Sequence, residues 1–239
     1  MSRHSKWAKI KHDKGASDAK RGQLFTKFGR AISVAAKQGP DPATNFRLRM
    51  AIDAARAGSM PKDTIERAIS RGSGVSGEVQ IEEVLYEGFG PGGAAVIIEG
   101  TSDNKNRTTA NIRHLFDKHG GKLGASGSVV WMFERRGVIR VARPSAGADE
   151  LALSFIDLGA LDVREEDSEL TVFVAPEKFE SVKQGIEKKE VAVAYAEAEY
   201  LPRERLTITD AAVRAKLEVL VLALDEDDDV QNVFTNTDI

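Results

Sequence analysis

The sequence predicts an α+β protein in which an N-terminal three-helix bundle is followed by two α+β domains. One of these domains, ferredoxin-like with the order βαββαβ, is expected to be inserted into the other. Apolar residues recur at helical spacing up to about residue 72, and short β-rich runs alternate with helical patterns after it. A Gly- and Ser-rich segment at residues 73–77 separates the two regions. With 239 residues, 41% of them hydrophobic, the chain is long enough to bury a core in each domain.

Three helices are expected before that segment. Apolar side chains lie three and four residues apart in the first helix, and Gly39-Pro40 ends its pattern. The second helix is expected to begin with Asp41 as its cap and Pro42 in its first turn. Each of the next two helices ends at a glycine, so the predicted ranges are 18–39, 41–58 and 59–72.

The rest of the chain is predicted to form two α+β domains. Glycines and a proline at residues 88–93 are typical of a turn between two strands, because a phosphate loop would instead lead into a helix. Strands are expected at 84–87, 94–99, 128–133, 137–142, 162–165, 170–174, 192–198, 205–208 and 230–235, and helices at 107–119, 148–158, 176–188 and 209–224. The predicted domains are 1–74, then 75–136 together with 202–239, and the inserted 137–201.

The charge of the chain is unevenly distributed. The formal net charge is only -3, but residues 1–74 hold 16 Lys and Arg against 6 Asp and Glu. Residues 75–143 are nearly neutral, and residues 144–239 hold 9 basic against 23 acidic side chains. A strongly basic region within an acidic chain favours a polyanionic partner.

The sequence lacks the patterns typical of disulfides, metal sites and several kinds of catalytic site. The chain has no cysteine, which excludes disulfides, thiolate nucleophiles and thiolate metal sites. Its four histidines are not spaced as two metal ligands on one helical turn, and Gly124–Ser128 lacks the second glycine of a nucleophile elbow. We therefore expect no enzyme activity, no cofactor, no metal and no catalytic residue.

The acidic run at residues 225–229 has alternating carboxylates like those of a calcium loop. The required glycine is replaced by Val230, however, and the closing glutamate by Asn236. We interpret the run as a solvated loop, and an intramolecular role in shielding the basic N-terminal arm, residues 1–17, stays open.

The strongest candidate site is the basic N-terminal region, where cations are interleaved with a tryptophan and histidines. Cations neutralise phosphates, and an indole can stack on a base. The alternative is that the cations only keep a small bundle soluble and that the tryptophan anchors the arm to it. The predicted contacts are Arg3, His4, Lys6, Trp7, Lys9, Lys11, His12, Lys14, Lys20, Arg21, Lys27 and Arg30.

A second candidate lies at the start of the helix predicted at 107–119. Lys105 and Arg107 stand at a helix N-terminus, which favours anions, and Arg113 lies on the polar side of the same helix. A simple helix cap by Asp103 or Asn106 explains the same residues, and both interpretations stay open.

Seven segments together resemble the YebC/PmpR family. They cover nearly the whole chain in the family's order, although Arg3 and Asp13 depart from its pattern. The segments are His4–His12, Asp18–Gly22, Phe25–Lys27, Met60–Ile69, Tyr86–Gly93, Asp103–Thr108 and Asp228–Val233.

The resemblance implies a helical N-terminal domain and two α+β domains. Bacterial members are described as probable transcriptional regulators that bind DNA and are cytoplasmic, so the resemblance implies both properties. A mitochondrial relative activates translation, and some bacterial relatives are implicated in relieving ribosome stalling. We therefore expect a non-enzymatic DNA-binding transcriptional regulator; the alternative is a ribosome-associated translation factor that binds ribosomal RNA. No membrane partner is expected, since the chain has no apolar run of spanning length.

Overall fold

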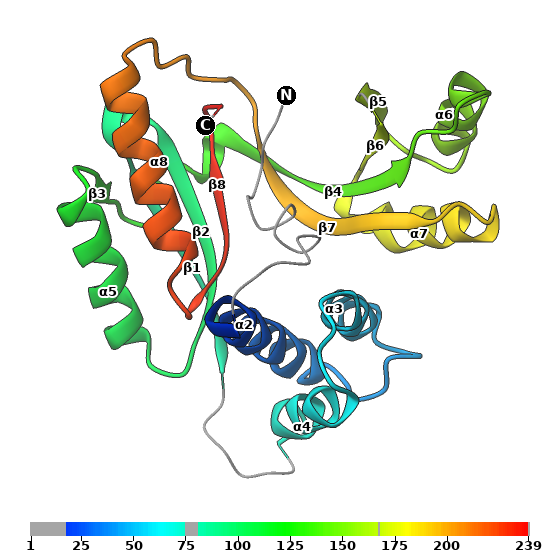
Figure 1. Cartoon of the computed structure of the whole chain (residues 1–239), viewed down its shortest axis with the longest axis horizontal. Coiled ribbons are helices and arrows are strands. Elements are labelled where there is room, and N and C mark those ends of the chain that lie inside the picture. The colour runs from blue at the N-terminus through cyan, green and yellow to red at the C-terminus, as the bar shows by residue number, and fades with distance from the viewer. Residues whose placement is uncertain (1–17, 75–80, 167, 239) are drawn as a thin grey trace. The chain divides into compact units, whose positions relative to one another are not determined.

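The computed structural model describes residues 18–74, 81–166 and 168–238. These residues form seven α-helices and two four-stranded sheets (Figure 1). The chain folds as two compact units, of which one runs up to Phe133 and resumes at Pro202, and the other spans Glu134–Leu201. None of the helices in these ranges is long and apolar enough to cross a membrane.

The first unit begins with three helices that pack around one apolar core. Side chains from all three helices, among them Ile32, Leu48 and Ile65, are at most 4% exposed. Burial of such apolar surface is the main source of stability in a bundle of short helices. The helices are α2 (Asp18–Ala36), α3 (Phe46–Ala57) and α4 (Lys62–Gly72).

The second helix starts later than the sequence predicts. The expected cap, Asp41, accepts a hydrogen bond from the backbone N–H of Ala43 in a turn instead. Asn45 caps α3, since its side-chain oxygen accepts from the N–H of Leu48 at 3.0 Å. The amide of Asn45 also donates to the carbonyl oxygens of Ala35 and Gly39, so this one side chain ties α3 to the end of α2.

The first sheet has the strand order β3-β1-β2-β8 with antiparallel neighbours. Helices α5 and α8 lie beside each other against this sheet (Figure 1). The turn predicted at residues 88–93 is confirmed, because it joins β1 to its antiparallel neighbour β2. The elements are β1 (Glu82–Phe89), β2 (Ala95–Ser102), α5 (Lys105–Lys118), β3 (Lys122–Leu123), α8 (Ala211–Asp225) and β8 (Val230–Thr235).

Two strand predictions are wrong in this unit. The predicted strand at 128–133 is absent up to residue 132: a short 3-10 helix covers Val130–Met132, and the next strand begins at Phe133. The carboxylate of Glu87 accepts the N–H groups of residues 127, 129 and 130, which are therefore not available to a sheet. Residues 205–208 are also irregular, although Ile208 packs into the core.

The second unit holds the other sheet, whose strand order is β5-β6-β4-β7. Strand β6 pairs antiparallel with both β4 and β5. Fully buried side chains from strands and helices, such as Ile139, Phe155 and Ile186, form its core. The elements are β4 (Phe133–Ala142), α6 (Ala148–Asp157), β5 (Asp162–Glu166), β6 (Glu169–Val174), α7 (Phe179–Lys188) and β7 (Val193–Pro202).

Candidate nucleic-acid interface

The predicted contacts in the N-terminal region fall into three groups. Lys20 and Arg21 are exposed in the first turn of α2, on the surface of the helical bundle. Lys27 and Arg30, further along the same helix, are drawn into contacts within the first unit. The others lie outside the described residues: Arg3, His4, Lys6, Trp7, Lys9, Lys11, His12 and Lys14.

Lys27 is buried and does not offer its charge to a phosphate. Its side chain is only 4% exposed, and its ammonium group donates to the carbonyl oxygen of Asp225 at 2.5 Å. Burial lowers the pKa of this lysine to about 8, against the opposing effect of the carboxylates in the acidic run. The prediction of Lys27 as a nucleic-acid contact is therefore at odds with its position.

Arg30 also contacts other residues of the first unit. Its guanidinium group is ion-paired to Asp229 and donates to the carbonyl oxygen of Thr101 at 2.9 Å. Only 17% of the arginine side chain is exposed. The contact fixes α2 to the end of strand β2, so Arg30 positions the bundle on the first sheet.

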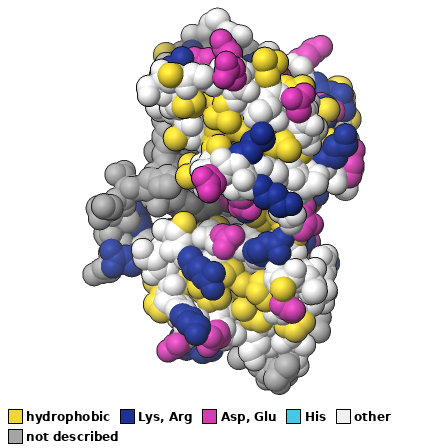
Figure 2. Space-filling view, turned by 90° about the vertical axis from the view of Figure 1, so that its right-hand side faces the viewer, with side chains coloured by type: hydrophobic (Ala, Val, Ile, Leu, Met, Phe, Trp, Pro, Cys, Tyr) yellow, Lys and Arg dark blue, Asp and Glu magenta, His cyan; other side chains and the backbone are white. Residues whose placement is uncertain are grey.

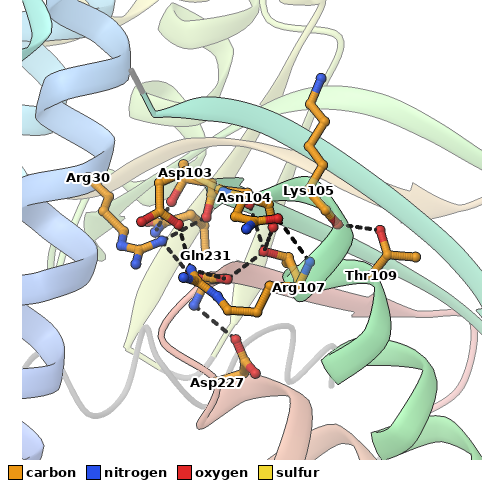
Figure 3. A network of polar contacts seen from close by, with 12 residues as sticks. Arg30, Asp103, Asn104, Lys105, Arg107, Thr109, Asp227 and Gln231 are labelled. Atoms are coloured by element: carbon orange, nitrogen blue, oxygen red, sulfur yellow. Dashed lines mark hydrogen bonds and ion pairs between the residues drawn. The ribbon is translucent and has the colours of Figure 1, made fainter. Parts of the chain in front are cut away.

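Asp229 is the centre of a polar network at this junction. Figure 3 shows this network from close by, with Arg30 and Arg107 labelled. Besides Arg30, its carboxylate accepts from the hydroxyl of Thr108 at 2.5 Å and lies 3.4 Å from the guanidinium of Arg107. The Asp229 side chain is only 4% exposed, and the N–H of Asp229 donates to the carboxylate of Asp227 at 2.9 Å. Three donors thus satisfy a carboxylate that would otherwise be costly to bury.

The acidic run is therefore not the solvated loop that the sequence predicted. Asp225 and Asp229 are buried at 9% and 3% exposure, whereas Glu226 and Asp228 face solvent. The buried carboxylates pair with Lys27 and Arg30 of α2. Shielding of the basic arm stays a prediction, because residues 1–17 lie outside the described residues.

The second cationic cluster lies at the start of α5. Asn104, rather than Asp103 or Asn106, caps this helix: its side chain accepts from the N–H of Arg107 at 3.1 Å. Arg107 is ion-paired to Asp103 at 2.5 Å, and Lys105 to Glu82 at 2.6 Å. Both cations already have carboxylate partners, so the cluster has the geometry of a capped helix start.

The remaining predicted contact, Arg113, is exposed on α5. On the face shown in Figure 2, Lys and Arg side chains of the described residues are interleaved with Asp, Glu and apolar side chains. In the described residues, no group of three or more His, Asp or Glu side chains is arranged to hold a metal ion.

Two family models together span this chain. The model described as "TACO1/YebC protein N-terminal domain" matches residues 5–75, and the one described as "TACO1/YebC second and third domain" matches residues 81–237. The chain belongs to the TACO1/YebC family. The first match contains the bundle and the basic region, and the second contains the acidic run and both sheets.

Similar proteins cover the full length of this family member. A protein of Thermoanaerobacter pseudethanolicus named a probable transcriptional regulatory protein is 48% identical over 100% of this chain and 98% of its own length. A protein of Treponema denticola with the same description is 50% identical over 100% of this chain and 97% of its own. A crystal structure of a conserved hypothetical protein from Aquifex aeolicus is 44% identical, with a TM-score of 0.87 over 98% of this chain and 97% of that one.

A third set of cations, Arg67 and Arg71 on α4, was not predicted from the sequence as a site. Both are exposed and line a cavity that α4 shares with α2. The sequence did hold a signal for the cavity. Gly22 and Gly29 lie seven residues apart in α2, on the face of the helix that carries Phe25 and Thr26.

Proposed function

We propose that this TACO1/YebC family member is a non-enzymatic, cytoplasmic regulator of gene expression that binds DNA and acts on transcription. The observation that carries the proposal is the comparison with proteins named probable transcriptional regulatory proteins. They are 44–50% identical and match this chain from end to end. Similarity over all domains supports a shared role better than similarity of one domain would.

The charge distribution supports a nucleic-acid partner independently. Residues 1–74 carry ten more basic than acidic side chains. Charges of this density attract phosphates from solution and release their counterions on binding.

We assign the primary phosphate contacts to the N-terminal arm and the first turn of α2. Lys27, Arg30 and Arg107 are reassigned to the junction between bundle and sheet, because each already contacts an oxygen of the acidic run. Lys105 and Arg113 are secondary contacts beside α5. The proposed primary set is Arg3, His4, Lys6, Trp7, Lys9, Lys11, His12, Lys14, Lys20 and Arg21.

We also infer that the chain has three domains, 1–74, 75–136 with 202–239, and an inserted ferredoxin-like domain at 137–201. The order β5-β6-β4-β7, with α6 and α7 between the strands in sequence, supports the split βαβ arrangement. This arrangement would leave the N-terminal region as the basic element and the other domains as further contact surfaces.

The deciding experiment compares DNA with the ribosome. Binding of the full chain to promoter-derived duplexes and to scrambled duplexes is measured at physiological salt, and lysate is sedimented with and without RNase. A preference above roughly a thousandfold for one sequence, as specific DNA-binding proteins show, is the expected result. RNase-sensitive sedimentation with ribosomes and no sequence preference on DNA would overturn the transcription proposal.

The role of the arm is tested by changing Lys6, Lys9 and Lys11 together to alanine. If the three cations contact phosphates, binding weakens and the slope of log affinity against log salt becomes shallower by about three. An unchanged slope would show that the arm is a solubilising tail. Trp7→Ala separates stacking from anchoring: stacking on a base predicts weaker binding, and anchoring predicts a lower melting temperature.

A further inference from the structure

A cavity of about 790 Å³ lies within the first unit, between helices α2 and α4 and the start of the first sheet. Its size is that of a pocket for one small organic ligand. It is lined by apolar side chains, three arginines, two threonines and one aspartate. These residues are Gly22, Phe25, Thr26, Gly29, Arg30, Met60, Thr64, Arg67, Ala68, Arg71, Ile81 and Asp103.

The α2 side of the cavity is kept open by two glycines within the helix. A Cβ at Gly22 would meet nothing within 4 Å, and one at Gly29 would meet only the Met60 methyl group at 3.7 Å. Gly58 and Gly72 differ, since a Cβ there would lie 2.3 Å from a Phe28 ring atom and 2.1 Å from a carbonyl oxygen. Glycine destabilises a helix interior relative to alanine, and packing requires neither glycine of α2.

The α4 side of the cavity is basic. Arg67 and Arg71 lie one turn apart and both are exposed. The guanidinium of Arg67 donates to two neutral oxygens, the carbonyl of Asp63 at 3.3 Å and the hydroxyl of Thr64 at 3.1 Å. Two further charged residues of the lining, Arg30 and Asp103, form ion pairs with Asp229 and Arg107.

An apolar surface beside a basic edge fits a flat apolar group that carries a phosphate. Phe25, Met60 and Ile81 offer the apolar contacts. The neighbouring arginines offer planar pairs of N–H donors, whose geometry matches the oxygens of a phosphate. A nucleotide has both parts. A base within a duplex is paired and stacked, so only an unpaired nucleotide can enter such a cavity.

We propose that this cavity binds one unpaired nucleotide of a single strand, with its phosphate at Arg67 and Arg71 and its base against Phe25. The proposal rests on the proposed function, because it names the state of the nucleic acid that the chain would bind. It places an unpaired-nucleotide site on the bundle itself, in addition to the arm.

The test uses the full chain and two variants of the cavity. Gly22→Leu fills the α2 side, and Arg67→Ala removes the phosphate contact. Arg56→Ala is the matched control, because Arg56 is exposed on α3 and does not line the cavity. Binding of a fluorescent single-stranded DNA of about 12 nucleotides, a length within the range of single-strand sites, is compared with binding of the same sequence as a duplex.

We expect both cavity variants to weaken single-strand binding about tenfold, as for the loss of one stacked base or one charged contact. Duplex binding should change less than about twofold, as should single-strand binding by Arg56→Ala, because one phosphate contact outside the cavity contributes little. The melting temperature of Gly22→Leu should not fall, since leucine is a better helix former and a Cβ there meets no atom.

Three results would overturn the proposal. In the first, both cavity variants bind the single strand as the wild type does, while the wild type still binds DNA; this removes the cavity site and leaves the proposed function intact. In the second, free adenosine monophosphate binds with an affinity that matches the single strand, which shows a small-molecule site. In the third, the wild type binds neither single strand nor duplex, which overturns the proposed function as well.

Discussion

The two halves of helix α2 carry the same kind of charge in opposite situations. Lys20 and Arg21 in its first turn are exposed, whereas Lys27 and Arg30 in its second half are buried or half-buried against the acidic run. In the sequence the four cations look alike, because each stands in a basic segment. Their surroundings differ because the acidic run, about 200 residues later, places its buried carboxylates beside Lys27 and Arg30.

This contrast shows that a cation's role depends on the carboxylates that the fold brings to it. A buried arginine with a buried partner fixes one element on another, and removing the partner leaves a charge without solvent. An exposed cation contributes little to stability, and its charged group is accessible to a ligand. Mutations at the buried contacts should therefore change stability, and mutations of the exposed cations should change nucleic-acid binding.

The largest effect is expected for Asp229→Ala. Loss of this buried carboxylate leaves Arg30 without its ion partner and removes one acceptor of the Thr108 hydroxyl. The free energy of unfolding should fall by about 3–5 kcal/mol, the usual cost of breaking a buried pair. Denaturant unfolding measures the change, with Asp228→Ala, at an exposed neighbour, as a control expected within about 0.5 kcal/mol. Equal losses in both variants would contradict a specific role for Asp229.

Lys27 should make stability rise at alkaline pH. Its pKa is about 8 in the folded chain and 10.5 when unperturbed, so between these values the unfolded chain binds more protons. The free energy of unfolding therefore increases with pH across this window, by at most about 3 kcal/mol from this residue.

Lys27→Met provides the comparison, since it removes the titrating group and keeps the apolar stem. The free energy of unfolding of the wild type, relative to that of the variant, should rise by at most about 3 kcal/mol as the pH passes from 8 to 10.5. Parallel stability curves for the two proteins would show that Lys27 keeps an ordinary pKa.

Glu87 is a buried carboxylate whose partners are backbone N–H groups, whereas Asp229 is paired with cations. Burial raises its pKa, but hydrogen bonds from the N–H groups of residues 127, 129 and 130 outweigh burial, and the net pKa is lowered from 4.5. Its stabilisation is present above that value and is lost as the pH falls through the lowered pKa.

Glu87→Gln should therefore lower the free energy of unfolding by about 1–3 kcal/mol at pH 7, because an amide oxygen accepts the three N–H groups less well. The deficit should narrow below pH 4.5. Urea unfolding at both pH values checks this, and a deficit that is independent of pH would argue against an ionised Glu87.

The smallest effect on stability is expected for the double change of Lys20 and Arg21 to alanine. Both side chains are exposed, so the free energy of unfolding should change by less than about 1 kcal/mol. Nucleic-acid binding should weaken, with a salt slope shallower by about two if both contact phosphates. Reduced stability with unchanged binding would place these residues with Lys27 and Arg30.

The sequence by itself determined the α+β class, the helices of the bundle and the turn between β1 and β2. These features follow from local patterns: apolar spacing, helix-ending glycines and a run of turn residues. It also located the basic region, since charge along the chain needs no structure to be counted.

Only the tertiary structure decided what individual side chains do. The start of α3 at Phe46 depends on Asn45, which also reaches the end of α2, and the irregular chain before Phe133 depends on the distant Glu87. The burial of Lys27 and the cavity between α2 and α4 likewise depend on residues far apart in sequence. Ion pairing, desolvation and cavity shape are set by neighbours in space, which a one-dimensional pattern does not record.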